Sequence, residues 1–131
     1  TCRSPMAEGI FNSICIKNNL PHRASSCGVA AFSDTTANRH AIDAAKELGA
    51  DISSHRSRLI SNKICALADK IYCMSAQHAR SVLSVCPDAH DKISVLNPPI
   101  PDPFGGGFDE YKSCAAALKK AVEAIVADIE V

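Results

Sequence analysis

The segment 70–74, KIYCM, restricts the fold of this chain more than any other stretch. It has almost no polar interruption, and a strand of this kind is buried on both faces, as in a parallel sheet. A helical pattern from about Ala76 to Cys86 follows it, and a second short strand is predicted over residues 92–96. A strand, a helix and another strand in this order predict an α/β unit with parallel strands.

The rest of the chain continues this alternation. The segment 22–32 predicts a short strand that ends near Gly28, and residues 39–48 predict a helix that Gly49 stops. A short helix is predicted before residue 70, and a long amphipathic helix over residues 110–129. We therefore expect a single domain with a doubly wound parallel sheet and helices on both faces. Sheets of this type bind ligands beyond the carboxyl ends of their strands.

Composition argues against several functional classes. The 131 residues carry a formal net charge of zero, and 47% are hydrophobic, which favours neither disorder nor a polybasic nucleic-acid surface. The sequence holds no apolar stretch of membrane-spanning length. We expect no nucleic-acid partner and no membrane partner.

The cysteines indicate a reducing compartment. There are seven, an odd number, and none forms a C-x-x-C pair, so neither a zinc site nor a thioredoxin-type motif is indicated. We expect most of them to be small core side chains in a cytoplasmic protein. No metal and no other cofactor is predicted.

The first residues predict a helix whose start can bind an anion. Ser4 can cap this helix and Pro5 fits its first turn. Arg3 stands just before it, where a guanidinium could bind two phosphate oxygens beside the partial positive charge of a helix N-terminus. The alternative is an ordinary helix start with Arg3 in solvent. The apolar face of the helix consists of Met6, Ala7, Ile10, Phe11 and Ile14.

Five stretches together decide between these interpretations. They resemble, in family order, segments of the low-molecular-weight protein tyrosine phosphatases, and they cover nearly the whole chain. The resemblance implies a flavodoxin-like fold with a four-stranded parallel sheet, a phosphorylated protein as substrate, and binding of phosphate or another oxyanion. The stretches are TCRSPMAEGIF (1–11), SSCGV (25–29), GADISSHRSRLI (49–60), ADKIYCMS (68–75) and DPFGGGFDEYKSCAAAL (102–118).

The resemblance also implies roles for individual residues. Arg3 corresponds to the phosphate-binding arginine, and Asp102 to the general acid. Thr1, Cys2 and Ser4 fall in the phosphate loop. Two further positions, Ser26 and His55, fall where the family has a hydrogen-bond network that orders this loop. For the substrate pocket we expect the aromatic side chains of Phe32 and Phe104.

The chain departs from the family pattern at its start. The family's nucleophilic cysteine would stand four places before Thr1, and its first strand would precede that cysteine. Cys2 corresponds to the family's second loop cysteine, which can form a disulfide with the nucleophile. We therefore expect the sequence to be an N-terminally truncated part of the domain, inactive by itself.

The resemblance implies hydrolysis through a phosphocysteine intermediate. Thr1 and the D-P-F-G-G run resemble the bacterial protein arginine phosphatases, which places phosphoarginine slightly ahead of phosphotyrosine as the substrate. Two alternatives stay open. One is an arsenate reductase of the same fold, for which Cys73 and Cys86 are the candidate relay cysteines. The other is a phosphate-binding domain without catalytic activity.

Overall fold

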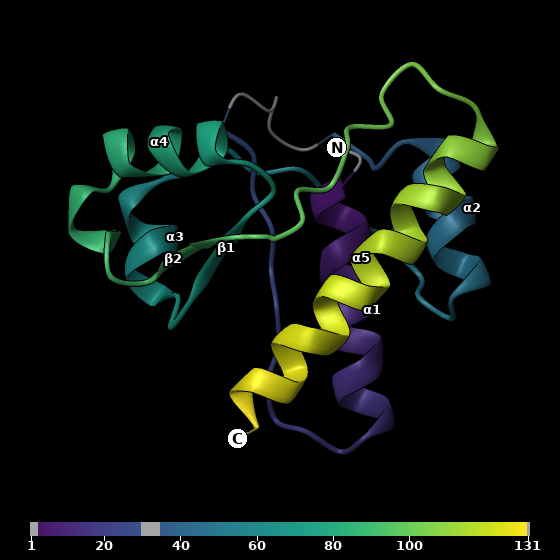
Figure 1. Ribbon diagram of the computed structural model, residues 1–131, viewed down its shortest axis with the longest axis horizontal. Helices are drawn as coiled ribbons and strands as arrows, with labels where there is room; N and C mark the ends of the chain where they lie inside the picture. The colour runs from purple at the N-terminus through teal and green to yellow at the C-terminus, as the bar shows by residue number, and fades with distance from the viewer. Residues whose placement is uncertain (1–2, 30–34, 131) are drawn as a thin grey trace.

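The computed structural model describes residues 3–29 and 35–130, in which three helices precede the first strand and a helix separates the two strands (Figure 1). Nowhere in these two ranges is a helix long and apolar enough to cross a membrane. The elements are α1 (Arg3–Lys17), α2 (Arg39–Glu47), α3 (Asn62–Leu67), β1 (Ile71–Cys73), α4 (Ala76–Val85), the 3-10 turn η1 (Pro87–Ala89), β2 (Ile93–Val95) and α5 (Phe108–Ile129).

The two strands form the predicted parallel pair. Ile71 of β1 lies opposite Ile93 of β2, and Cys73 lies opposite Val95. The two faces of β1 pack differently, because Tyr72 contacts one hydrophobic cluster while Ile71 and Cys73 belong to another. Hydrophobic side chains therefore pack on both faces of β1, as expected from its apolar sequence, but only Cys73 is buried, while Ile71 and Tyr72 are half-buried.

The strand predicted over residues 22–32 is reduced to one bridge in the part of it that the structure describes. Gly28 pairs with Leu59, its N–H donating to the carbonyl of Arg58 at 2.8 Å. Four residues earlier, the N–H and C=O of Ala24 are bound by the side chain of Asn12. The prediction of a regular strand was wrong here, because the backbone finds a side-chain partner on α1 instead of a strand.

In Figure 1 this extended segment runs between α1 and α2 on one side and β1, β2, α3 and α4 on the other. The elements on each side contribute to a separate hydrophobic cluster. The helical core packs α1, α2 and α5 together, and its fully buried side chains include Met6, Tyr111 and Leu118. The thiol core is formed by side chains from β1, β2, α3, α4 and the segments next to them. Its buried members are Ile60, Cys65, Cys73, Val82, Cys86 and Ala89.

Most helix ends follow their local sequence. Gly49 adopts a φ of +83° after α2, as expected for a glycine that ends a helix. At the start of α5, Glu110 accepts the N–H of Gly107 at 2.9 Å, so the helix begins slightly before the predicted residue 110. The prediction for Ser4 was wrong, because α1 already begins at Arg3 and Ser4 lies inside the first turn.

Candidate active site

Arg3 and Asp102 are far apart in sequence and close together in space. The Nη1 of Arg3 donates to the carbonyl oxygen of Ile100 at 2.7 Å, and its Nη2 lies 3.9 Å from Oδ2 of Asp102. The Arg3 side chain is only 15% exposed, whereas that of Asp102 is 56% exposed. The structure thus brings the two principal predicted residues together, with the arginine fixed and the carboxylate open to solvent.

The loop after β2 holds the carboxylate of Asp102 in place. Its Oδ1 accepts the N–H of Phe104 at 3.0 Å, so one oxygen binds the loop and the other faces Arg3. The turn continues with an N–H···O bond from Gly106 to the carbonyl of Pro103 at 2.9 Å. Gly105 has a φ of +85°, a left-handed conformation that glycine adopts without steric cost.

The predicted aromatic pocket is not assembled in the described residues. Phe104 is 77% exposed and does not pack on the site. Phe32 lies outside the described residues, as do Thr1 and Cys2 of the predicted phosphate loop.

His78 is a third ionisable group, on which the charges of Arg3 and Asp102 both act. It lies in the first turn of α4, just after β1, and its N–H donates to the cap residue Ser75 at 3.2 Å. Burial and then the positive charge of Arg3 lower the pKa of His78 from its ordinary 6.5, while the carboxylate of Asp102 acts in the opposite direction. Sequence reasoning missed His78 because it matches no ligand spacing.

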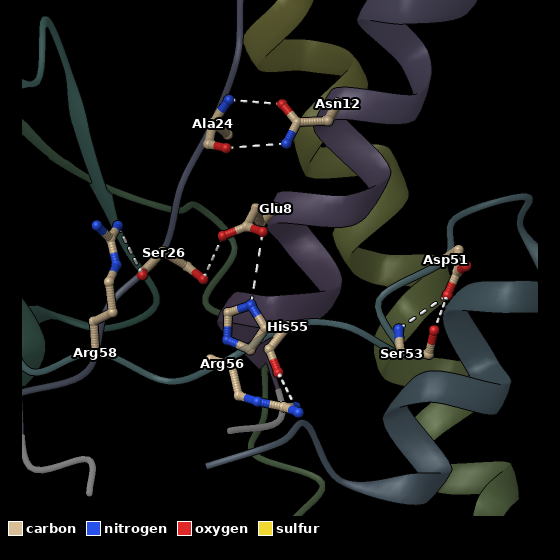
Figure 2. A network of polar contacts seen from close by, with 9 residues as sticks. All are labelled: Glu8, Asn12, Ala24, Ser26, Asp51, Ser53, His55, Arg56 and Arg58. Atoms are coloured by element: carbon tan, nitrogen blue, oxygen red, sulfur yellow. Dashed lines mark hydrogen bonds and ion pairs between the residues drawn. The ribbon is translucent and has the colours of Figure 1, made fainter. Parts of the chain in front are cut away.

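Glu8 connects the two predicted support residues. The hydroxyl of Ser26 donates to Oε1 of Glu8 at 2.9 Å, and Nδ1 of His55 lies 3.6 Å from Oε2 of Glu8 (Figure 2). His55 is almost buried, with 8% of its side chain exposed. Ser26 and His55 are therefore joined through Glu8, which sequence reasoning missed, and the role of these residues in ordering the phosphate loop stays a prediction. The signal was a carboxylate within an otherwise apolar helix segment, MAEGI.

A groove of about 730 Å³ runs along α1 beside this network. It differs from the site defined by Arg3 and Asp102, since neither residue lines it. The candidate active site is the pair of converging charged side chains, because a groove alone does not supply reactive groups. Among the residues lining the groove are Glu8, Asn12, Ser26, Asp51, His55 and Arg58.

Comparisons with known proteins agree on one family. A family model described as low molecular weight phosphotyrosine protein phosphatase matches residues 1–131. A protein-arginine-phosphatase from Bacillus subtilis is 30% identical over 99% of this chain and 91% of its own length, and arsenate reductase 1 from Staphylococcus epidermidis is 32% identical over 94% and 86%. A solved low molecular weight protein tyrosine phosphatase from T. tengcongensis has a TM-score of 0.93 at 33% identity, covering 98% of this chain and 92% of its own. The predicted fold class is confirmed.

Proposed function

Because this chain belongs to the low molecular weight phosphotyrosine protein phosphatase family, we propose that Arg3 and Asp102 catalyse the removal of a phosphoryl group from a phosphorylated protein. Members of this family are cysteine-dependent phosphatases. Arg3 binds the phosphoryl group and Asp102 is the general acid. The observation that carries this proposal is the 3.9 Å approach of the two side chains at the start of α1.

The setting of Arg3 supports a phosphate-binding role. Its hydrogen bond to Ile100 fixes the guanidinium, so less conformational freedom is lost when an anion binds. The N-terminus of α1 adds backbone N–H groups and partial positive charge beside it. Together they would stabilise the charge on the equatorial phosphoryl oxygens in the transition state.

The position of Asp102 supports proton transfer to the leaving group. In the proposed reaction a cysteine thiolate attacks phosphorus, an S–P bond forms, and the bond from phosphorus to the leaving group breaks. Asp102 gives its proton to the departing atom, and its carboxylate then accepts a proton from the water that hydrolyses the phosphocysteine. The exposure of the carboxylate allows it to reach both groups.

We place phosphoarginine ahead of phosphotyrosine as the substrate. The support is the resemblance of Thr1 and the D-P-F-G-G run to the arginine-specific branch, together with the similarity to relatives named protein-arginine-phosphatase. The hydroxyl of Thr1 would hydrogen-bond a guanidinium, and a site built around such a bond rejects substrates that lack the partner. Thr1→Val keeps the side-chain shape and should lower the preference for phosphoarginine over phosphotyrosine.

The test is hydrolysis of a phosphoarginine protein and of an aryl phosphate. The protein is expressed together with the residues that its coding sequence places before Thr1. We expect Arg3→Ala to lower kcat/KM by about 10²–10³-fold and Asp102→Asn to lower it by about 10²-fold or more. Lys17→Ala, at the exposed end of α1, serves as the matched control. Wild-type rates in both site variants would refute the assigned roles.

Arsenate reduction is the second candidate, because a relative at 32% identity has that name. It requires further cysteines to resolve the oxidised nucleophile. Cys73 and Cys86 are both buried in the thiol core, and burial raises the pKa of Cys73, which opposes formation of the thiolate that a relay needs. Consumption of a thiol reductant that depends on arsenate would favour the reductase over the phosphatase.

A further inference from the structure

The thiol core contains cysteines that the proposed phosphatase reaction does not use. Three of its six buried residues are Cys65, Cys73 and Cys86, and Cys27 packs against its edge. All four are free thiols. Such a concentration of thiols in one small cluster raises the question of whether two of them are placed to react with each other.

Cys65 and Cys86 are in direct contact through their sulfur atoms. The thiol of Cys86 lies 2.7 Å from Sγ of Cys65, and the two residues are 3% and 4% exposed. A disulfide bond is about 2.05 Å long, so a movement of less than about 1 Å would join the two sulfurs. The other polar contact of the Cys86 thiol is longer, at 3.6 Å to the carbonyl of Ser61.

The backbone on both sides holds this contact in place. Cys65 lies in α3, with its N–H bound to the carbonyl of Ser61 at 3.1 Å and its own carbonyl bound by Nζ of Lys92 at 3.2 Å. Cys86 caps the end of α4, where its N–H donates to the carbonyl of Val82 at 2.7 Å. Because secondary structure positions both residues, closing the bond costs little additional order.

We propose that Cys65 and Cys86 are an oxidation site, which forms an intramolecular disulfide on reaction with a small-molecule disulfide such as glutathione disulfide. One cysteine sulfur attacks the glutathione disulfide and releases one glutathione thiolate, leaving a mixed disulfide. The second cysteine sulfur attacks this mixed disulfide, forms the internal S–S bond and releases the second glutathione. The protein loses two electrons and two protons, and the two glutathione thiols receive them.

Burial makes this reaction slow without opposing its product. Desolvation, followed by the hydrogen bond with Cys86, raises the pKa of Cys65 to about 12, so this thiol keeps its proton at neutral pH and is a poor initial nucleophile. Attack on the oxidant requires local opening of the thiol core. Once the bond has formed, the same packing protects it from reduction.

The disulfide would close a loop that contains β1 and α4. Arg3 and Asp102 lie outside this loop, so the bond would stabilise one side of the active site without blocking it. A loop of this length restricts the unfolded chain enough to raise Tm by about 10–15 °C.

Peptide mapping tests the pairing directly, because cleavage after Lys and Arg places the seven cysteines on seven different peptides. The reduced 131-residue chain is incubated with glutathione disulfide until its mass no longer changes, its remaining thiols are alkylated, and it is then digested without reduction. We expect a loss of two hydrogens and a cross-link between peptides 64–70 and 81–92. Thiols that all remain alkylatable, or a cross-link that joins other cysteines, would overturn the proposal.

Two variants give an independent measurement on the same chain. Cys65→Ser should abolish both the cross-link and the rise in Tm on oxidation. Cys15→Ser, a buried cysteine of the helical core, should keep both. Tm is compared between the oxidised and reduced forms of each variant, so that any loss of stability from the substitution itself cancels. A rise in Tm that survives Cys65→Ser would contradict the proposed site.

Discussion

The two hydrophobic clusters differ in the side chains that build them. The helical core buries large groups, such as Tyr111, Met6 and Leu118, between three helices. The thiol core is smaller, and half of its buried members are cysteines. Since buried apolar area supplies most of the folding free energy, we infer that the helical core dominates stability. Arg3 belongs to an element of the helical core, while His78 and Asp102 follow the two strands that contribute to the thiol core. The candidate site therefore combines residues from both parts of the molecule.

The largest expected effect compares one truncation in each cluster. Leu118→Ala removes a fully buried side chain from the helical core and should lower the free energy of unfolding by about 3–4 kcal/mol. Val82→Ala in the thiol core loses less apolar surface and should cost about 2 kcal/mol. Urea titration measures both. A larger loss for Val82→Ala would reverse the ranking of the two clusters.

A smaller effect is expected where α1 meets the segment after α2. A Cβ at Gly9 would collide with Cγ2 of Ile52, a buried residue. Gly9→Ala should therefore destabilise the fold by about 1–3 kcal/mol, even though alanine normally favours a helix over glycine. Lys17→Ala, exposed on the same helix, controls for helix propensity. If Gly9→Ala raises stability in urea, the close packing of α1 on Ile52 is wrong.

The Glu8 network is expected to contribute a still smaller amount. Glu8→Gln keeps an acceptor for the hydroxyl of Ser26 but removes the charge facing His55, and should lower the free energy of unfolding by about 1 kcal/mol. Glu8→Ala removes both partners and should cost more. Equal stability of the wild type and both variants in urea would show that the contacts of Glu8 with Ser26 and His55 do not contribute to the free energy of unfolding.

The smallest expected effect is the pH dependence of stability that comes from His78, whose pKa depends on the charge of Arg3. Because the folded-state pKa of His78 is lowered, the unfolded state binds a proton more readily, and stability should fall as the pH drops below about 6.5. Arg3→Gln removes one cause of the shift and should raise the pKa of His78, whereas Arg39→Gln, at an exposed position of α2, should not. NMR titration of the His78 ring measures this. An unchanged pKa of His78 in Arg3→Gln would show that the charge of Arg3 does not act on this histidine.

Sequence reasoning predicted the elements that local pattern determines. The apolar run 70–74, the helical periodicity of α1 and the glycine after α2 each reflect a local constraint, and each prediction is confirmed in the structure. The regular strand near Gly28 failed because its backbone partners come from a side chain on α1 and from residues 58–60. The sequence of the segment itself does not indicate such partners, because they come from distant parts of the chain.

The candidate site, too, could be predicted only in part, because some of its residues are recognisable from sequence motifs and others only from tertiary contacts. Arg3 and Asp102 were predicted from a family resemblance, and the structure brings them together. Glu8 and His78 were missed, since a single carboxylate or imidazole on a helix is usually a solvated surface residue. Their importance depends on which charged groups the fold places beside them, and that depends on tertiary contacts.

The most direct test of the central claim is how kcat/KM depends on the leaving group for a series of aryl phosphates. The enzyme is expressed with the residues that its coding sequence places before Thr1, and the wild type is compared with Asp102→Asn. If Asp102 protonates the leaving group, wild-type kcat/KM should change little with the pKa of the phenol, and the variant should fall steeply as that pKa rises. Parallel dependences in the two proteins would contradict the assignment of Asp102 as the general acid beside Arg3.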